Sequence, residues 1–170
     1  MRVALPILVL LSAAPAASAA TPRLGGAQAR ALLTSKQLWA TIDVCNAPDQ
    51  PNTLGVRGSM PGDGNAHDRM YMRFKLQYQS AAGKRWVDLA SSVHGTFVEV
   101  GGGGSARQDG SSFQITPAGH TAFVLRGVVD YQWRRGRAVL LSVSRPTSAG
   151  HVSLAGADPA GFSAATCSIG

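Results

Sequence analysis

Apolar and polar side chains alternate most regularly over residues 69–79. One parity is apolar: Met70, Met72, Phe74, Leu76 and Tyr78. The other parity is basic, aromatic or amide: Arg69, Tyr71, Arg73, Lys75, Gln77 and Gln79. A period of two residues is that of a β-strand, because successive side chains point to opposite faces of a sheet. The segment therefore predicts a strand with one face on a core and the other in water.

The same alternation returns in shorter segments along the rest of the chain. Strand-like runs lie near residues 38–45, 53–59, 85–89, 93–100, 113–115, 121–133, 138–144 and 162–169. Turn residues such as Asn46-Ala47-Pro48-Asp49 and Arg135-Gly136 separate them. One or two helical turns are expected across Ala27 to Leu33. Seven to nine antiparallel strands predict an all-β sandwich, with a closed β-barrel as the alternative.

Two of these regions carry more specific expectations. In residues 38–45 the apolar parity includes Ile42 and the polar parity includes Thr41 and Asp43, so a half-buried strand is predicted. Gly101 to Gly104 and the polar residues that follow them, 105–110, are predicted to form a mobile loop. Glycine loses more conformational freedom on ordering than any other residue, which disfavours regular structure there.

The first residues have the order of a secretory signal peptide. A basic start at Met1-Arg2 is followed by an apolar stretch, Val3 to Leu11, and then by small residues that include Ala17-Ser18-Ala19. The apolar stretch is shorter than the ~20 residues that a membrane-spanning helix needs. We therefore predict a signal peptide over residues 1–19, cleaved between Ala19 and Ala20, and a secreted product. A flexible leader is predicted over 20–36 and one sandwich domain over 37–170.

Export makes the two cysteines informative. In an oxidising compartment a pair of cysteines normally forms a disulfide, which predicts a bridge between Cys45 and Cys167. Two free thiols or an incomplete metal site are the alternatives. The bridge would join the first strand to the last residues of the chain.

Several segments resemble the immunoglobulin-like and fibronectin-type sandwiches of secreted bacterial proteins. They are Met70–Gln79, Gly83-Lys84-Arg85-Trp86, Gly127–Trp133 and Arg135-Gly136. The resemblance implies a core tryptophan on a central strand and a tyrosine on a late strand, places that Trp86 and Tyr131 could fill. The cysteines depart from the immunoglobulin pattern, because they lie on the outer strands. The bias of 13 Arg to 3 Lys also resembles secreted proteins from actinobacterium-like, high-GC genomes.

Composition and charge exclude some classes of enzyme and indicate candidate binding residues. Glu99 is the only glutamate, which excludes zincins and glycosidases built on two glutamates. The formal charge is +7, and the basic residues gather in two places. Arg69, Arg73 and Lys75 share one strand face with Tyr71, and Arg134, Arg135 and Arg137 surround a hairpin turn. A solvated basic edge that prevents pairing between sheets is the preferred interpretation. The alternative is that these residues bind an anionic polymer of the cell wall or the extracellular space.

No catalytic, metal or cofactor site is predicted. Residues 63–68, Asp-Gly-Asn-Ala-His-Asp, resemble a calcium loop only in part, since the sixth position is Asp68 and the twelfth is Phe74, so a polar turn is the preferred interpretation. Four histidines are scattered, and no Gly-x-Ser-x-Gly motif presents a nucleophile. We therefore predict a non-enzymatic binding or structural module of unknown ligand, with an anionic polymer and another extracellular protein as the two candidate partners. A hydrolase with an unrecognised Ser/His/Asp site is the alternative.

Overall fold

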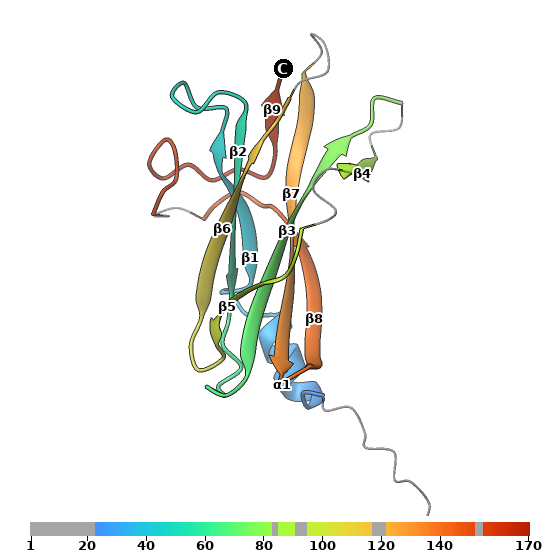
Figure 1. Ribbon diagram of the computed structural model, residues 1–170, viewed down its shortest axis with the longest axis vertical. Helices are drawn as coiled ribbons and strands as arrows, with labels where there is room; N and C mark the ends of the chain where they lie inside the picture. The colour runs from blue at the N-terminus through green and yellow to red at the C-terminus, as the bar shows by residue number, and fades with distance from the viewer. Residues whose placement is uncertain (1–22, 83–84, 91–94, 117–121, 152–154) are drawn as a thin grey trace, which may run out of the picture.

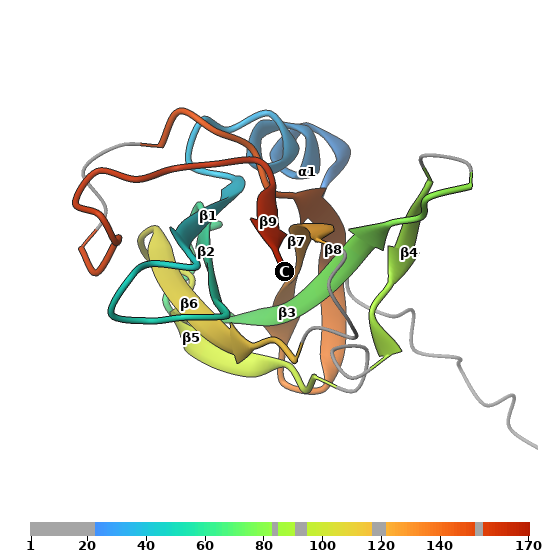
Figure 2. The same cartoon turned by 90° about the horizontal axis from the view of Figure 1, so that it is seen from above.

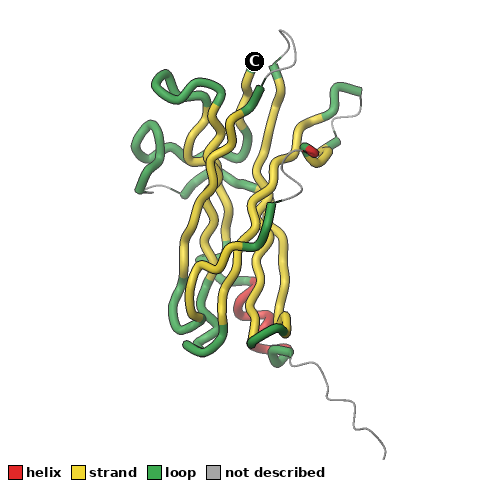
Figure 3. Tube along the Cα trace, in the orientation of Figure 1, coloured by secondary structure: helices red, strands yellow, loops and turns green. Residues whose placement is uncertain are grey.

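The computed structural model describes residues 23–82, 85–90, 95–116, 122–151 and 155–170. Strands dominate this part of the chain, and the prediction of an all-β protein is confirmed (Figure 1, Figure 3). In chain order the elements are α1 (Gly26–Leu33), β1 (Trp39–Cys45), β2 (Thr53–Met60), β3 (Arg69–Gln79), β4 (Trp86–Asp88), β5 (Val98–Gly102), β6 (Arg107–Gln114), β7 (Phe123–Arg135), β8 (Ala138–Pro146) and β9 (Cys167–Ile169).

The strands form two antiparallel sheets that face each other. The smaller sheet has the order β1-β2-β6. The larger has the order β4-β3-β7-β8, with β5 also paired to β3 and β9 also paired to β7. Seen from above, the strands curl around a common interior (Figure 2). No hydrogen-bonded ladder joins the two sheets among the described strands, so these strands do not close into one continuous barrel.

The interior between the sheets is filled by the apolar parity of each strand. On β3, Met70, Met72 and Leu76 are fully buried, as the alternation over residues 69–79 predicted. Trp133 of β7 is fully buried as well, and its indole N–H donates to the carbonyl oxygen of Pro61 at 3.0 Å. The predicted strand with one buried and one wet face is confirmed for β3.

The predicted disulfide between Cys45 and Cys167 is present. Cys45 ends β1 in the smaller sheet, and Cys167 begins β9, which pairs with β7 in the larger sheet. The bridge therefore links the two sheets covalently and fixes the last residues of the chain against the body.

The prediction that β1 is half exposed is wrong. The segment before β9 lies along the free edge of β1, where the Ile42 N–H donates to the Ala164 carbonyl at 2.9 Å and the Ala164 N–H donates back at 3.0 Å. The Asp158 N–H donates to the Asp43 carbonyl at 2.9 Å. Thr41 and Asp43 are consequently buried, although they lie on the polar side of the strand.

Helix α1 occupies the place where one or two helical turns were expected. Its Leu32 is buried in the core, and Arg145 of β8 donates from Nη2 to the Leu33 carbonyl at 3.0 Å. The leader predicted over 20–36 is therefore not flexible throughout, because this part of it packs on the domain. The signal peptide predicted over 1–19 and its cleavage point between Ala19 and Ala20 lie outside the described residues.

The prediction of a mobile glycine-rich loop is also wrong. Gly101 and Gly102 end β5, and β6 begins at Arg107. Every residue of β6 pairs with β2, from Arg107 opposite Met60 to Gln114 opposite Thr53. Ladder hydrogen bonds come from the backbone, so they form without apolar side chains when a neighbouring strand is already in place.

Trp86 does not occupy the core position that the resemblance implied. It begins the three-residue edge strand β4, is half-buried, and lies under the guanidinium of Arg126 at 4.3 Å from the ring centroid. The tryptophan at the centre of the interior is Trp133. Tyr131 is fully buried on the late strand β7, and its hydroxyl donates to the Trp39 carbonyl.

Candidate functional site

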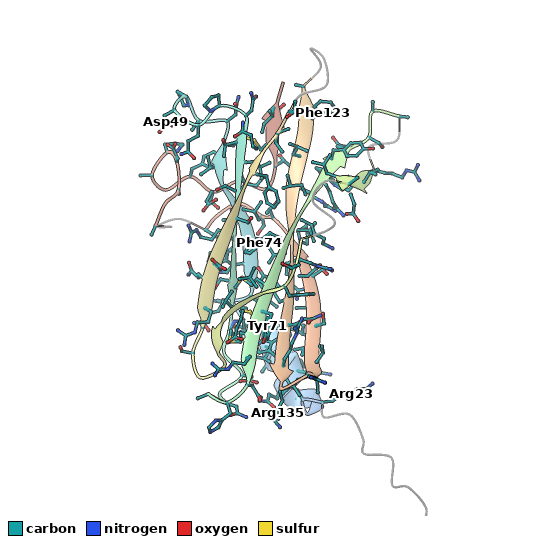
Figure 4. The ribbon with its side chains drawn as sticks, in the orientation of Figure 1. Arg23, Asp49, Tyr71, Phe74, Phe123 and Arg135 are labelled. Carbon is teal, nitrogen blue, oxygen red and sulfur yellow. A yellow bond between two sulfur atoms is a disulfide. The ribbon has the colours of Figure 1, made fainter. Side chains whose placement is uncertain are left out.

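The candidate site is the outer face of the larger sheet, which we call the basic face. It comprises Arg69, Tyr71, Arg73 and Lys75 of β3, Asp130, Gln132 and Arg134 of β7, Ser142 and Ser144 of β8, and Phe97 and Glu99 from the β5 region. Because β3 and β7 are adjacent and antiparallel, Tyr71 is opposite Gln132, and Arg73 is opposite Asp130. Figure 4 shows Tyr71 in the half of the molecule that ends at Arg135.

Two of the predicted binding cations share one carboxylate. Arg73 donates from Nε and Nη2 to Oδ2 of Asp130 at 2.9 and 2.7 Å, and Lys75 Nζ lies 3.0 Å from the same oxygen. Ser144 donates its hydroxyl to the other carboxylate oxygen. Burial opposes the ionisation of Asp130, but the hydrogen bonds from Ser144, Lys75 and Arg73 outweigh it and lower the pKa of Asp130. Asp130 thus neutralises one of the two cations.

Arg134 is held differently from its neighbours. Its guanidinium carbon lies 4.1 Å from the ring centroid of Tyr71 and 4.9 Å from that of Phe97. Its Nε donates to Oε1 of Gln132 at 2.8 Å. Within the described residues Arg134 has no carboxylate partner, and its two terminal nitrogens make no hydrogen bond. Arg134 is therefore a fixed cation whose fork of donors stays available.

Glu99 connects two more residues of the basic face. Tyr71 donates its hydroxyl to Oε2 of Glu99 at 3.0 Å, and Arg69 Nε lies 3.6 Å from Oε1. Partial burial and the hydrogen bond to Glu99 raise the pKa of the Tyr71 hydroxyl. The Arg69–Glu99 pair is about half exposed on both sides, so it contributes at most about 1 kcal/mol. Glu99 can therefore be exchanged for another anion at little cost.

The three arginines of the β7–β8 hairpin do not form one cluster. Arg134 lies on the basic face, whereas Arg135 points to the end of the sandwich (Figure 4). Arg135 donates from Nε and Nη2 to the two oxygens of Asp68 at 2.7 Å each. This pairing lowers the pKa of the buried Asp68 and raises that of Arg135. Arg137 is exposed and forms no ion pair with the residues that the structure describes.

The basic face keeps two positive charges, because two carboxylates face four cations: Arg69, Arg73, Lys75 and Arg134.

Four residues of the basic face were not predicted from the sequence: Phe97, Glu99, Gln132 and Asp130. Asp130 could have been found, because it shares the outward parity of β7 with Gln132. Phe97 could not, since nothing in its own segment tells which strand it will lie beside.

The loop over residues 63–68 matches the preferred interpretation of a polar turn. Oδ1 of Asp63 accepts from the Asn65 N–H at 3.0 Å, and Oδ1 of Asn65 accepts from the His67 N–H at 3.0 Å. One side-chain oxygen each of Asp63 and Asn65 thus binds the loop's own N–H groups, whereas Asp63 Oδ2 is buried without a hydrogen-bond partner among the described residues. In the described part of the chain no three metal-ligating side chains gather into a possible ion site.

One serine–histidine contact bears on the hydrolase alternative. Ser148 Oγ lies 3.2 Å from Nε2 of His151, whose ring stacks on Trp39 with centroids 4.4 Å apart. Partial burial lowers the pKa of His151. No carboxylate among the described residues binds the imidazole, so the contact lacks the group that orients a catalytic histidine. His94 and His120 lie outside the described residues.

Comparisons with known proteins do not assign this chain to a group. No protein-family model matches it, and neither the curated proteins nor the solved structures contain a significant match. No helix of the described residues has the length and hydropathy to cross a bilayer. The function must therefore be inferred from the residues of the chain itself.

Proposed function

We propose that this chain is a secreted, non-enzymatic binding module whose basic face binds an anionic polymer outside the cell. The observation that carries the proposal is Arg134, a cation fixed between the rings of Tyr71 and Phe97 and bound by Gln132 rather than by a carboxylate. An arginine held in this way loses little side-chain freedom when an anion binds, and its planar fork suits sulfate, phosphate or carboxylate groups.

The arrangement of charge favours a polymer over a single small anion. The cations Arg69, Arg73 and Lys75 share the outward face of β3, over about 20 Å at the usual rise of a strand. Arg134 lies beside this row on β7. A chain of anionic groups could contact several of these cations at once, and each contact would release counterions. The exposed Arg69–Glu99 pair can open to add one more contact.

An immunoglobulin-like build is part of the proposal. The orders β1-β2-β6 and β3-β7-β8 correspond to the A-B-E and C-F-G strands of such sandwiches, with β5 beside β3 in the place of an additional edge strand. Secretion is supported by the order of residues 1–19 and by the disulfide. Because this architecture serves many functions, it supports a binding role only together with the basic face.

The experiment measures binding to heparin and to polyphosphate as a function of salt. We expect the affinity to fall steeply between 50 and 200 mM salt, as it does when cations release condensed counterions. Arg134→Gln is expected to weaken binding about 10-fold and to reduce the slope of log affinity against log salt by about one. The thermal midpoint of this variant should fall only slightly, because Arg134 forms no ion pair with the described residues and the substitution removes only its ring contacts and one hydrogen bond at a half-buried site.

Arg30→Gln is the matched control. Arg30 is exposed on α1, away from the basic face, and the substitution changes the net charge by the same amount. We expect it to leave affinity and slope close to native. Equal losses for Arg30→Gln and Arg134→Gln would mean that only the net charge matters, and would overturn the proposal. Absence of salt-dependent binding to both polymers would overturn it as well.

A further inference from the structure

A second concave site lies at the other end of the sandwich. A cavity of about 620 Å³ opens there, near the labelled Phe123 and far from Tyr71 in Figure 4. Within the described part of the chain it is lined by Tyr78, Leu89, Gln114, Ile115, Thr116, Phe123 and Leu125. Pockets that hold small ligands commonly measure about 300–1,000 Å³, and the volume of this cavity falls within that range.

Both sheets contribute to the walls of this cavity. Tyr78 of β3 and Leu125 of β7 are opposite each other in the larger sheet, and both belong to the inward parity. Ile115 follows the last residue of β6, and its N–H donates to the Asn52 carbonyl at 2.8 Å. Leu89 is fixed through its N–H, which donates to the Leu76 carbonyl at 2.9 Å. Backbone hydrogen bonds therefore hold the apolar walls in place.

The lining is mostly apolar and carries no charged side chain, and two of its residues, Tyr78 and Thr116, have hydroxyls. None of the seven lining residues is an aspartate, glutamate, histidine, lysine or arginine. The side-chain amide of Gln114 is already engaged, accepting from Thr53 and donating to the Pro51 carbonyl at 3.1 Å. The Tyr78 hydroxyl, in contrast, makes no hydrogen bond with the described residues. A molecule that fits should be mainly hydrocarbon and should carry a polar group within reach of Tyr78.

We propose that this cavity binds the hydrocarbon chain of an uncharged amphiphile, with its polar group hydrogen-bonded to Tyr78. The branched side chains of Leu89, Ile115 and Leu125 provide the apolar contact, and Phe123 closes one wall. The site is separate from the basic face, because Tyr71 and Tyr78 are seven positions apart on one strand, roughly 23 Å. The inference is therefore independent of the proposed binding of anionic polymers.

The test uses a fluorescent apolar probe, N-phenyl-1-naphthylamine, and 1-dodecanol as its competitor. We expect saturable probe fluorescence with the native protein and its displacement by dodecanol. Ile115→Trp places a large ring in the cavity from a half-buried position and should weaken probe binding at least 10-fold. Val98→Trp adds the same ring at a 49% exposed site on β5 and should leave probe binding native.

A second variant keeps the proposal testable if Ile115→Trp does not fold. Tyr78→Phe preserves the shape of the wall and removes the hydroxyl, so dodecanol should bind about 5-fold more weakly while the probe binds as before. Displacement by free dodecanol or by phosphatidylcholine vesicles distinguishes a soluble amphiphile from a membrane lipid as the source of the chain. No saturable probe binding, or probe binding unchanged by Ile115→Trp in a folded variant, would overturn the proposal.

Discussion

Strands β1 and β3 have the same alternating pattern but different surroundings. On β3 the outward side chains stay partly in water, as Arg73 and Lys75 do, and they carry the candidate site. On β1 the outward side chains Thr41 and Asp43 are covered by the segment that leads to the disulfide. A period of two residues therefore identifies a strand and its core side, but it does not tell whether the polar side meets water.

The covered side of β1 satisfies its polar groups internally. Thr41 Oγ1 lies 2.7 Å from Ser163 Oγ, and Asp43 Oδ2 accepts from Arg57 Nε at 2.8 Å. Buried polar groups cost about 1–3 kcal/mol when they have no partner. Outward polar side chains are thus buried and structural on β1, whereas those on β3 remain partly exposed. Three measurements can sharpen or break this comparison.

The largest effect is expected from removing the disulfide. The loop that it closes spans 122 residues, and the chain-entropy model assigns such a bridge about 4–5 kcal/mol. Replacing both cysteines, Cys45→Ala with Cys167→Ala, should lower the free energy of unfolding by that amount in urea titrations. The covering segment should also lose protection from hydrogen exchange at Ala164 before β3 does.

The native protein in reductant is the control for the cysteine variant. It should unfold at the same urea concentration as the double variant, because both lack the bridge. An unfolding midpoint within experimental error of the oxidised protein would show that the covering segment is fixed without the bridge. The contrast between β1 and β3 would then depend on packing alone.

The second effect compares a buried with an exposed carboxylate. Asp43→Ala leaves Arg57 without its partner in a region where Asp43 is only 4% exposed, and should cost about 2–3 kcal/mol. Glu99→Ala removes a carboxylate that is about half exposed and should cost below about 0.5 kcal/mol. Urea unfolding of both variants measures the difference. Similar costs would contradict the assignment of β1 as the covered strand.

The alternation of apolar and polar residues predicted the fold correctly where a strand's two faces are a buried one and an exposed one. The parity of residues 69–79 was sufficient to place Met72 inside and Arg73 outside, and the expectation of export, in a chain with two cysteines, was sufficient to predict the disulfide. The prediction from the alternation failed where a segment far away in the sequence determines burial or strand pairing. Thr41 is buried by residues more than a hundred positions away, and β6 is a strand because β2 offers its backbone groups. No side-chain pattern within either segment contains that information.

The candidate site was predicted as a set of cations but not as an arrangement. Parity placed Arg73 and Lys75 on one face, yet Asp130, which neutralises one of them, comes from another strand. Arg134 has no carboxylate partner among the described residues, whereas Arg135 is paired with Asp68. The two arginines differ because they are consecutive at the end of β7, so their side chains point in different directions. Register between strands is fixed by the whole sheet, so the sequence of one strand cannot supply it.

The smallest effect is the pH dependence of the unfolding free energy that is due to Asp130, on the basic face of the larger sheet. Since the pKa of Asp130 is lowered in the folded state, its ionised form stabilises the fold above the ordinary value of 3.8, and that contribution is lost as the pH falls through the lowered value. Asp130→Asn should cost about 1–2 kcal/mol at pH 7, less than Asp43→Ala because the amide can still accept from Ser144. Unfolding free energies measured between pH 7 and 2 should therefore converge for the variant and the native protein at the acid end. Asp49→Asn, in an exposed loop, should follow the native curve throughout. If the unfolding free energies of Asp130→Asn and the native protein differed by the same amount at every pH, the charge of Asp130 would contribute nothing to its pairing with Arg73 and Lys75. The ionisation of Asp130 on the outer face of the larger sheet would then have no effect on stability.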